Sequence, residues 1–373
     1  HSMKCVMRMI LPAYERAVEA MVGTTNAGWT RGRMAPEQTL AARLLGEMRM
    51  RERTVSCRGY CDLGCFFMSV VHKVQWEVER WSGTPVEVTQ VLRALREGAE
   101  GMEGGEGAKA VPELTGRYET AYGLTAAVRI AKGLGQGDIG SPVRSKILIA
   151  IIAKTVSRLC EGAKITGSDK RASMLFFADD GLILADDVQT LRRAFEAMWI
   201  VARVAGLRLQ VKGKKKTAWS ATYWESDGTE RDVTGWEMVM PDGSTIPQLE
   251  GDDKYKYLGT ELTTGWNRGE AQTAVRKKVV AKCRQAIGLI ARIPLLSEEQ
   301  LAKAIELALA GIIGYYGRST VITWEDAVQI ENARGEALRA KGFTTGLPKA
   351  TMYVNRGSGL EHTHAYAMAA AAL

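Results

Sequence analysis

The sequence has few cysteines and no long hydrophobic run. Six cysteines in 373 residues do not predict a disulfide framework, and the N-terminus does not resemble a secretory signal. The longest strongly apolar run covers residues 147–153, far below the roughly 20 residues that cross a bilayer. We therefore expect an intracellular protein in a reducing compartment, nuclear or organellar, with no membrane segment.

Compositional extremes and fixed-period repeats are absent as well. Hydrophobic residues make up 46% of the chain and charged residues 25%, which excludes wholesale disorder and collagen. The length allows two or three domains of roughly 100 to 200 residues each. Lys and Arg outnumber Asp and Glu by 50 to 42, a net charge of +8. This excess suits a polyanionic partner, but an ordinary soluble surface can carry it too.

The first part of the chain predicts an α+β structure. Residues 55–71 combine β-formers with cysteines around one acid, Asp62, and predict a buried strand on which Cys57, Cys61 and Cys65 share one face. Residues 174–184 are two apolar runs broken by Asp179-Asp180-Gly181, a pattern typical of a tight β-hairpin. Further predicted elements are helices over residues 39–53, 141–159 and 190–204, hairpins at Asp227-Gly228 and Asp242-Gly243, and a solvated Gly/Glu loop near residues 97–107.

Two helix starts carry specific signals. Ser141-Pro142 predicts a helix with the Ser141 hydroxyl as N-cap and proline at the first helical position. From residue 269 onward the pattern is helical throughout, and Ser297 with Gln300 and Thr323 with Asp326 form predicted capping boxes. A helical domain is therefore expected after residue 262.

Three acids stand out because apolar β-structure surrounds them. Asp62 lies in the first predicted strand, and Asp179 and Asp180 lie at the predicted hairpin. Buried carboxylates are unfavourable unless they are hydrogen-bonded or bound to a cation. Oxygen ligands without a nearby histidine favour Mg²⁺ over zinc. Taken alone, however, Asp-Asp-Gly is also a common turn sequence.

The order and surroundings of these acids resemble the palm of a reverse transcriptase. Five segments carry the resemblance: Asp62 with an aromatic residue five positions later and then Ser-Val; residues 133–142, Gly-Leu-Gly-Gln-Gly-Asp-Ile-Gly-Ser-Pro; residues 177–180, Phe-Ala-Asp-Asp; residues 206–210 followed by Lys216-Thr217; and residues 257–259, Tyr-Leu-Gly. Upstream, residues 26–33 (Asn-Ala-Gly-Trp-Thr-Arg-Gly-Arg) are similar to a segment of non-LTR retrotransposon and group II intron enzymes.

The resemblance implies a right-hand polymerase fold of the α+β class. It implies partial fingers over residues 1–55, a palm with a ferredoxin-like antiparallel sheet over residues 56–262, and a helical thumb with a C-terminal extension over residues 263–373. The palm would include a finger-like insertion with the acidic loop. Only 25 residues precede Asn26, so the fingers resemble a truncated version of the family's.

The resemblance also implies a chemistry and its partners. Asp62 and Asp179 would hold two Mg²⁺ ions, with Mn²⁺ as a possible substitute, and Asp180 would support the site. Lys216 would protonate or neutralise the leaving pyrophosphate. The implied partners are an RNA template, a DNA or RNA primer and dNTPs.

The same resemblance assigns binding residues. Substrate contacts fall to Phe67, whose ring would exclude a 2′-hydroxyl, and to Gln136, Gly137, Ser141 and Pro142. The primer grip is Tyr257, Leu258 and Gly259. A basic helix face that includes Arg276, Lys277, Lys282 and Arg284 suits a phosphate backbone, although such a face is equally typical of a solvated helix.

Two departures from the family pattern leave an alternative open. Lys146 and Gln210 stand where the family usually has asparagine, and the basic fingertip motifs are not seen. The alternative to a polymerase is a catalytically inactive, reverse-transcriptase-like protein that binds nucleic acid. The three acids favour the first hypothesis, and the short fingers favour the second.

Overall fold

The structure is a computed structural model. It describes residues 2–23, 26–97, 115–116, 119–126, 128–130, 132–134, 138–213, 216–251, 253–263, 268–317, 320 and 322–343. Most of the predicted Gly/Glu loop, Gln136 and Gly137 lie outside the described residues. Two compact units make up the chain: residues 1–34 with 48–251, and residues 35–47 with 252–373. Helix α2 (Ala35–Glu52) therefore contributes residues to both units.

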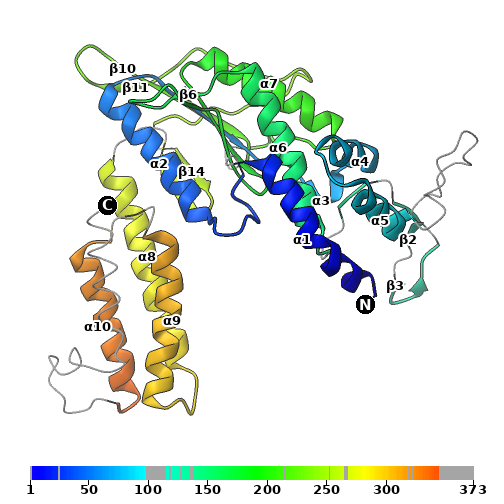
Figure 1. The fold of residues 1–373 in the computed structure, drawn as a ribbon. Coiled ribbons are helices and arrows are strands. Elements are labelled where there is room, and N and C mark those ends of the chain that lie inside the picture. Colours follow the sequence, from blue (N-terminus) through cyan, green and yellow to red (C-terminus); the bar gives the residue numbers. More distant parts are fainter. Residues whose placement is uncertain are drawn as a thin grey trace, which may run out of the picture. The chain divides into compact units, whose positions relative to one another are not determined.

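A five-stranded antiparallel sheet is the centre of the first unit (Figure 1). Its strands, in spatial order, are β11 (Glu230–Asp232), β10 (Ala218–Trp224), β1 (Ser56–Cys61), β9 (Asp180–Ala185) and β8 (Met174–Phe177). Strand β1 pairs with β10 on one side and β9 on the other. All six of its residues are buried, as expected for a central strand. The observed class is thus α+β with an antiparallel sheet, as predicted.

Helices α6 (Ser141–Leu159) and α7 (Val188–Val204) pack against each other and against this sheet (Figure 1). The core between them joins Cys57 and Cys61 of β1 to apolar residues of both helices. Gly59 lies beneath the Phe195 ring, where a Cβ atom would come within 2.5 Å of the ring. The alternation of side chains along β1 therefore turns residues 57, 59 and 61 toward the helices.

A second apolar cluster joins the helices that flank α6. These are α1 (Ser2–Val22), α4 (His72–Trp81) and α5 (Val86–Glu97). Inside this region Arg144 and Glu79 form a fully buried ion pair at 2.6 Å, and the Arg144 guanidinium lies 4.4 Å from the centre of the Trp76 ring.

The remaining short elements of the unit are α3 (Phe66–Ser69) and the strand pairs β2 (Thr115–Gly116) with β5 (Val128–Arg129), β3 (Glu119–Thr120) with β4 (Gly123–Leu124), β6 (Ala163–Lys164) with β7 (Arg171–Ala172), and β12 (Met238–Val239) with β13 (Thr245–Ile246).

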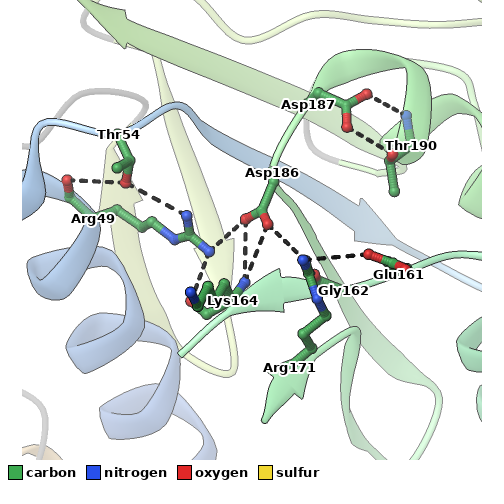
Figure 2. A network of polar contacts seen from close by, with 9 residues as sticks. All are labelled: Arg49, Thr54, Glu161, Gly162, Lys164, Arg171, Asp186, Asp187 and Thr190. Carbon is green, nitrogen blue, oxygen red and sulfur yellow. Dashed lines mark hydrogen bonds and ion pairs between the residues drawn. The ribbon is translucent and has the colours of Figure 1, made fainter. Parts of the chain in front are cut away.

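A polar network fixes the C-terminal end of β9 (Figure 2). Asp186 forms ion pairs with Arg49 of α2 and, at 2.8 Å, with Arg171 of β7. It also accepts the backbone N–H of Lys164 at 3.2 Å. The next residue, Asp187, caps α7 by accepting the Thr190 N–H at 2.7 Å. These contacts tie a helix, a hairpin and the sheet together at one point.

The second unit contains a hairpin and three helices. Strands β14 (Lys254–Tyr257) and β15 (Thr260–Thr263) form the hairpin, and the helices are α8 (Arg268–Ala291), α9 (Glu298–Tyr316) and α10 (Trp324–Ala340). Val279 and Cys283 of α8 and Ile305 of α9 belong to its apolar core. Both predicted capping boxes, at Ser297 and Thr323, are present, so the predicted helix starts are confirmed.

Two local predictions are wrong. The strand predicted over residues 55–71 ends at Cys61, because Gly64 and Cys65, which has a left-handed φ of 49°, turn the chain into α3. Cys65 is consequently exposed, whereas Cys57 and Cys61 are buried as expected. Ser141 does not cap α6: it is already the first helical residue, and its hydroxyl donates to the carbonyl of Leu134.

The six cysteines are all free. Among the helices that the structure describes, none is long and apolar enough to cross a membrane.

Candidate catalytic site

The register of the sheet brings the three predicted acids together. Cys61 of β1 faces Gly181 of β9, so Asp62, the next residue along β1, falls opposite Asp180. Facing residues of antiparallel strands have Cα atoms about 4.5–5.5 Å apart. Asp179 precedes Asp180 in the turn between β8 and β9. Asp62, Asp179 and Asp180 therefore form a carboxylate cluster at one end of the sheet.

The turn that presents Asp179 is a strained two-residue loop. Phe177 pairs with Asp180, so Ala178 and Asp179 alone connect the strands. Ala178 has a φ of 60°, a conformation that disfavours an L-residue other than glycine by roughly 1–2 kcal/mol. Gly181 gives room for the neighbouring ring, because a Cβ atom there would lie 2.6 Å from Phe176. The loop needs support from its surroundings to keep this shape.

Asp62 is held by the segment that contains the predicted Lys-Thr pair. Its carbonyl accepts the Gln210 N–H at 2.9 Å, and its own N–H donates to the Thr217 hydroxyl at 3.2 Å. Lys216 Nζ lies 2.8 Å from Asp62 Oδ2. The Lys216 side chain remains about half exposed, and the Asp62 side chain is 25% exposed. The cluster thus has one direct cationic partner among the described residues.

Electrostatics distinguish the three acids. Burial raises the pKa of Asp179, and repulsion from Asp62 adds to the rise. Loss of solvation and then repulsion from Asp179 and Asp62 raise the pKa of Asp180 to about 6, against a smaller lowering by Lys216. The Asp180 side chain is exposed, so solvent screening reduces what this shift contributes to stability. Like charges held this close favour a bound cation or a proton.

The donor chemistry fits a hard divalent cation, since two of the carboxylates have raised pKa values that a cation would offset. The described side chains, however, do not form a complete set of metal ligands in this structure. Across the described residues, no group of three or more His, Cys, Asp and Glu side chains stands where it could hold a metal ion. Asp62 is instead paired with Lys216.

Phe67 lies on α3, five residues after Asp62. Its ring is half-buried and contacts the Trp29 ring edge-on, with centroids 5.5 Å apart. Its carbonyl accepts the Leu134 N–H at 2.7 Å, and Leu134 in turn accepts the hydroxyl of Ser141. Hydrogen bonds therefore connect α3 to the start of α6, where Ser141 and Pro142 lie.

Lys146 of α6 is buried and donates to the carbonyl of Trp29 at 3.3 Å. Burial lowers the pKa of this lysine, while the acids of α1, Glu19 and Glu15, raise it. The residue that departs from the family pattern at this position thus holds the chain segment next to Phe67.

The predicted primer-grip residues lie in the second unit, in the hairpin of β14 and β15. Tyr257 ends β14, and Leu258 and Gly259 form a two-residue turn with φ values of 46° and 78°, typical of a type I′ turn. The Tyr315 hydroxyl of α9 donates to the Leu258 carbonyl at 2.6 Å. Helix α9 therefore fixes the tip of this hairpin.

Two residues of the predicted basic face of α8 also make contacts within the helical unit. Arg276 is paired with Asp326 at 2.8 Å, and Lys282 donates to the Tyr316 hydroxyl at 2.5 Å and lies over its ring. Lys277 and Arg284, seven residues apart, are exposed. Lys282 is exposed as well, and the role of this helix face in binding a phosphate backbone stays a prediction.

Comparisons with known proteins give distant similarities. No protein-family profile and no curated protein matches the chain. Solved structures that are similar include apo telomerase from Candida tropicalis truncated from its C-terminal domain, with 12% identity over 70% of this chain and 44% of that one and a TM-score of 0.43. Telomerase from Candida albicans in complex with a TWJ fragment of telomeric RNA gives 9% identity, 97% and 51% coverage and a TM-score of 0.46. The chain spans about half the length of these structures, and a likeness this distant does not specify an activity.

Sequence reasoning missed three side chains that contact this site. Trp29 touches Phe67, Thr217 binds the backbone of Asp62, and Asn26 contacts the loop before Asp179. Asn26 and Trp29 belong to the segment that resembles non-LTR and group II enzymes, and Thr217 follows Lys216. The position of these residues within the sequence motifs could therefore have pointed to them. The direction of each side chain could not be predicted from the sequence.

Proposed function

We propose that the chain is a reverse transcriptase, an RNA-directed DNA polymerase, or a part of one. The observation that carries the proposal is the strand register, Cys61 opposite Gly181, because it gathers Asp62, Asp179 and Asp180 from separate segments. A scaffold gains nothing from three neighbouring acids of which two, Asp179 and Asp180, have pKa values raised by loss of solvation and by the nearby negative charges. Nucleotidyl transfer does need such a cluster.

We assign the sheet with α6 and α7 as the palm and the helices α8, α9 and α10 as the thumb. The order of elements supports this assignment: an acid after the first central strand, a helix that begins with Ser141-Pro142, an acid-bearing hairpin, a second helix and a further hairpin before the helical unit. The similarity of residues 26–33 to non-LTR and group II intron enzymes supports a place in that lineage. The retroviral branch is the less favoured assignment.

In this proposal each residue has a defined task. Asp62 and Asp179 would hold divalent ions, Mg²⁺ or Mn²⁺, which would supply activation of the primer 3′-hydroxyl and neutralisation of the triphosphate. Lys216 forms an ion pair with Asp62 at 2.8 Å in this structure. During the reaction it leaves Asp62, contacts the phosphate and neutralises the leaving pyrophosphate. The Phe67 ring, backed by Trp29, excludes a 2′-hydroxyl and so selects dNTPs.

The partners follow from the same assignment. An RNA template and a DNA or RNA primer pass the sheet, and the hairpin with Tyr257, Leu258 and Gly259 grips the primer. The exposed Lys277 and Arg284 contact phosphates without reading sequence. The telomerase of Candida albicans binds a fragment of telomeric RNA, and we propose RNA binding for this chain on its own residues.

A second candidate is an inactive protein that binds nucleic acid. It is favoured by the pairing of Asp62 with Lys216 and by the lack, among described side chains, of a three-ligand metal group. In such a protein Lys216 permanently replaces the cation.

Primer extension separates the two candidates. Purified chain is given an RNA template, a labelled primer and dNTPs with Mg²⁺ or Mn²⁺, beside the Asp179→Asn variant, and template binding is followed by fluorescence anisotropy. A polymerase extends the primer and loses extension in the variant while binding is kept. Binding without extension above the variant in either metal would establish the inactive candidate.

A further inference from the structure

Residues 26–28 lie directly against the loop that carries Asp179. Asn26 forms an isolated parallel bridge with Phe176, and the Ala27 N–H donates to the Phe176 carbonyl at 2.9 Å. Gly28 approaches so closely that a Cβ atom on it would collide with the backbone nitrogen of Ala178. A segment about 150 residues away in sequence thus acts as a support for the β8–β9 loop.

The Asn26 side chain makes the contact that bears on catalysis. It is fully buried, and its Oδ1 accepts the Gly28 N–H at 2.8 Å and the Ala178 N–H at 3.3 Å. The two backbone donors define which end of the amide is the oxygen. Ala178 has the left-handed φ of 60°. Of the two residues in the β8–β9 loop, Asn26 therefore binds the one whose backbone conformation is unfavourable.

Stability alone does not account for an amide at this position. Asn26 Nδ2 is buried, with no hydrogen-bond partner among the described residues. A buried donor without a partner is unfavourable. A side chain that only filled space would be better apolar, whereas one that must accept two N–H groups needs this oxygen.

We infer that Asn26 is a positioning residue for Asp179. Its Oδ1 holds Ala178 in the left-handed conformation, which fixes the direction in which the next residue, Asp179, presents its carboxylate. The inference rests on the proposed polymerase function for its kinetic consequence. Its structural consequence, the order of the β8–β9 loop, does not depend on activity.

Three variants test the contact from different sides. Asn26→Ala removes the acceptor, Asn26→Asp keeps an acceptor, and Gly28→Ala pushes a methyl group against Ala178. The matched control is Gln248→Ala, which removes another side-chain-to-backbone hydrogen bond, from Gln248 Nε2 to the Val233 carbonyl at 2.6 Å. All are compared at equal folded fraction, determined by circular dichroism.

The first readout is amide hydrogen exchange of peptides that cover residues 174–185, measured without metal. Asn26→Ala and Gly28→Ala should exchange about 10-fold faster in the β8–β9 loop, Asn26→Asp should be close to the parent chain, and Gln248→Ala should be unchanged. Unaltered exchange of the loop in Asn26→Ala would overturn the inference. Equally faster exchange in Gln248→Ala would overturn it too, because general loosening would then be the cause.

The second readout is primer extension with varied dNTP concentration. Asn26→Ala should lower kcat about 10- to 100-fold, as loss of a residue that orients a metal ligand does, and leave the KM for dNTP within about twofold. A raised KM with an unchanged kcat would contradict a positioning role. If the parent chain extends no primer, the polymerase proposal fails, and the exchange measurement alone decides the role of Asn26.

Discussion

Strand β9 has a pair of adjacent aspartates at each end, and the two pairs have opposite surroundings. Asp186 and Asp187 at its C-terminal end are fully used: one binds Arg49 and Arg171, and the other caps α7. Asp179 and Asp180 at its N-terminal end have no ion pair among the described residues, and both have raised pKa values. The same dipeptide therefore stabilises the fold at one end and opposes it at the other.

Under the proposed function, the contrast separates acids that stabilise the fold from acids that bind a ligand. Carboxylates that stabilise a fold acquire cations and backbone donors, as Figure 2 shows for Asp186 and Asp187. Carboxylates that bind a ligand are kept in excess of their partners, at a cost in stability. Substitutions at Asp179 or Asp180 should accordingly reduce activity without reducing stability. Substitutions at Asp186 or Asp187 should reduce stability without reducing activity.

The largest effect is expected from exchanging charge for an isosteric amide at each end. Asp179→Asn should lower primer extension on the order of 10³-fold or more, because a neutral amide cannot hold a divalent cation as a carboxylate does. Asp186→Asn should retain extension within about threefold once folded protein is matched. Single-turnover extension with Mg²⁺ measures both. Comparable losses in the two variants would contradict the division.

The next effect is on stability. Asp186→Ala removes the partner of Arg49, whose side chain is only 10% exposed, and of Arg171. Because the Asp186 side chain is itself one third exposed, we expect a modest loss of about 1–2 kcal/mol. In a unit of this size that lowers Tm by roughly 2–8 °C. Differential scanning calorimetry measures the shift, and an unchanged Tm would show that the network in Figure 2 does not stabilise the unit.

How much of this could be predicted depends on the range of the interactions. The acid-bearing hairpin, the capping boxes of α9 and α10 and the order of helices and strands follow from local signals such as Asp-Asp-Gly and Ser297 with Gln300. The end of β1 at Cys61 depends on a left-handed Cys65, which no propensity predicts. The pairing of Asp186 with Arg49, 137 residues away, is a tertiary contact without a sequence pattern.

The residues of the candidate site divide in the same way, into those that sequence motifs predict and those that depend on tertiary contacts. Motif order was enough to single out Asp62, Asp179, Asp180 and Lys216, and the structure brings all four together. The support by Asn26 and the contacts of Arg276 with Asp326 and of Lys282 with Tyr316 could be seen only from the side-chain directions. A helix pattern shows which residues share a face, but not which partner faces them.

A smaller effect is expected at Asp187. Its side chain accepts from both the N–H and the hydroxyl of Thr190 at 2.7 Å. Loss of such an N-cap in Asp187→Ala should reduce stability by about 1 kcal/mol, whereas Asp187→Asn, which caps nearly as well, should reduce it by a few tenths. Urea denaturation followed by circular dichroism measures both variants. An equal loss in the two would show that the charge of Asp187 matters more than its capping bonds.

The smallest expected change in stability is a gain, whereas the substitutions at Asp186 and Asp187 cause losses, and it depends on pH. The pKa of Asp180 is raised from 3.8 to about 6, so the folded state holds this proton more tightly than the unfolded state does. Its contribution to stability is present below about pH 4 and is lost as pH rises through 6. Asp180→Asn should therefore match the parent chain at pH 4 and be more stable at pH 7.5. After discount for solvent screening, we expect a gain of about 0.5–1 kcal/mol.

Thermal unfolding in EDTA at the two pH values measures this difference without interference from cations. Asp187→Asn serves as the control, because it makes the same chemical change at the other end of β9, where the carboxylate is a cap. It should gain nothing at pH 7.5. If Asp180→Asn gained equally at pH 4 and pH 7.5, packing of the amide would be responsible. Neither the lost solvation of the Asp180 carboxylate nor repulsion from Asp179 and Asp62 would then be the reason that this end of the strand opposes folding.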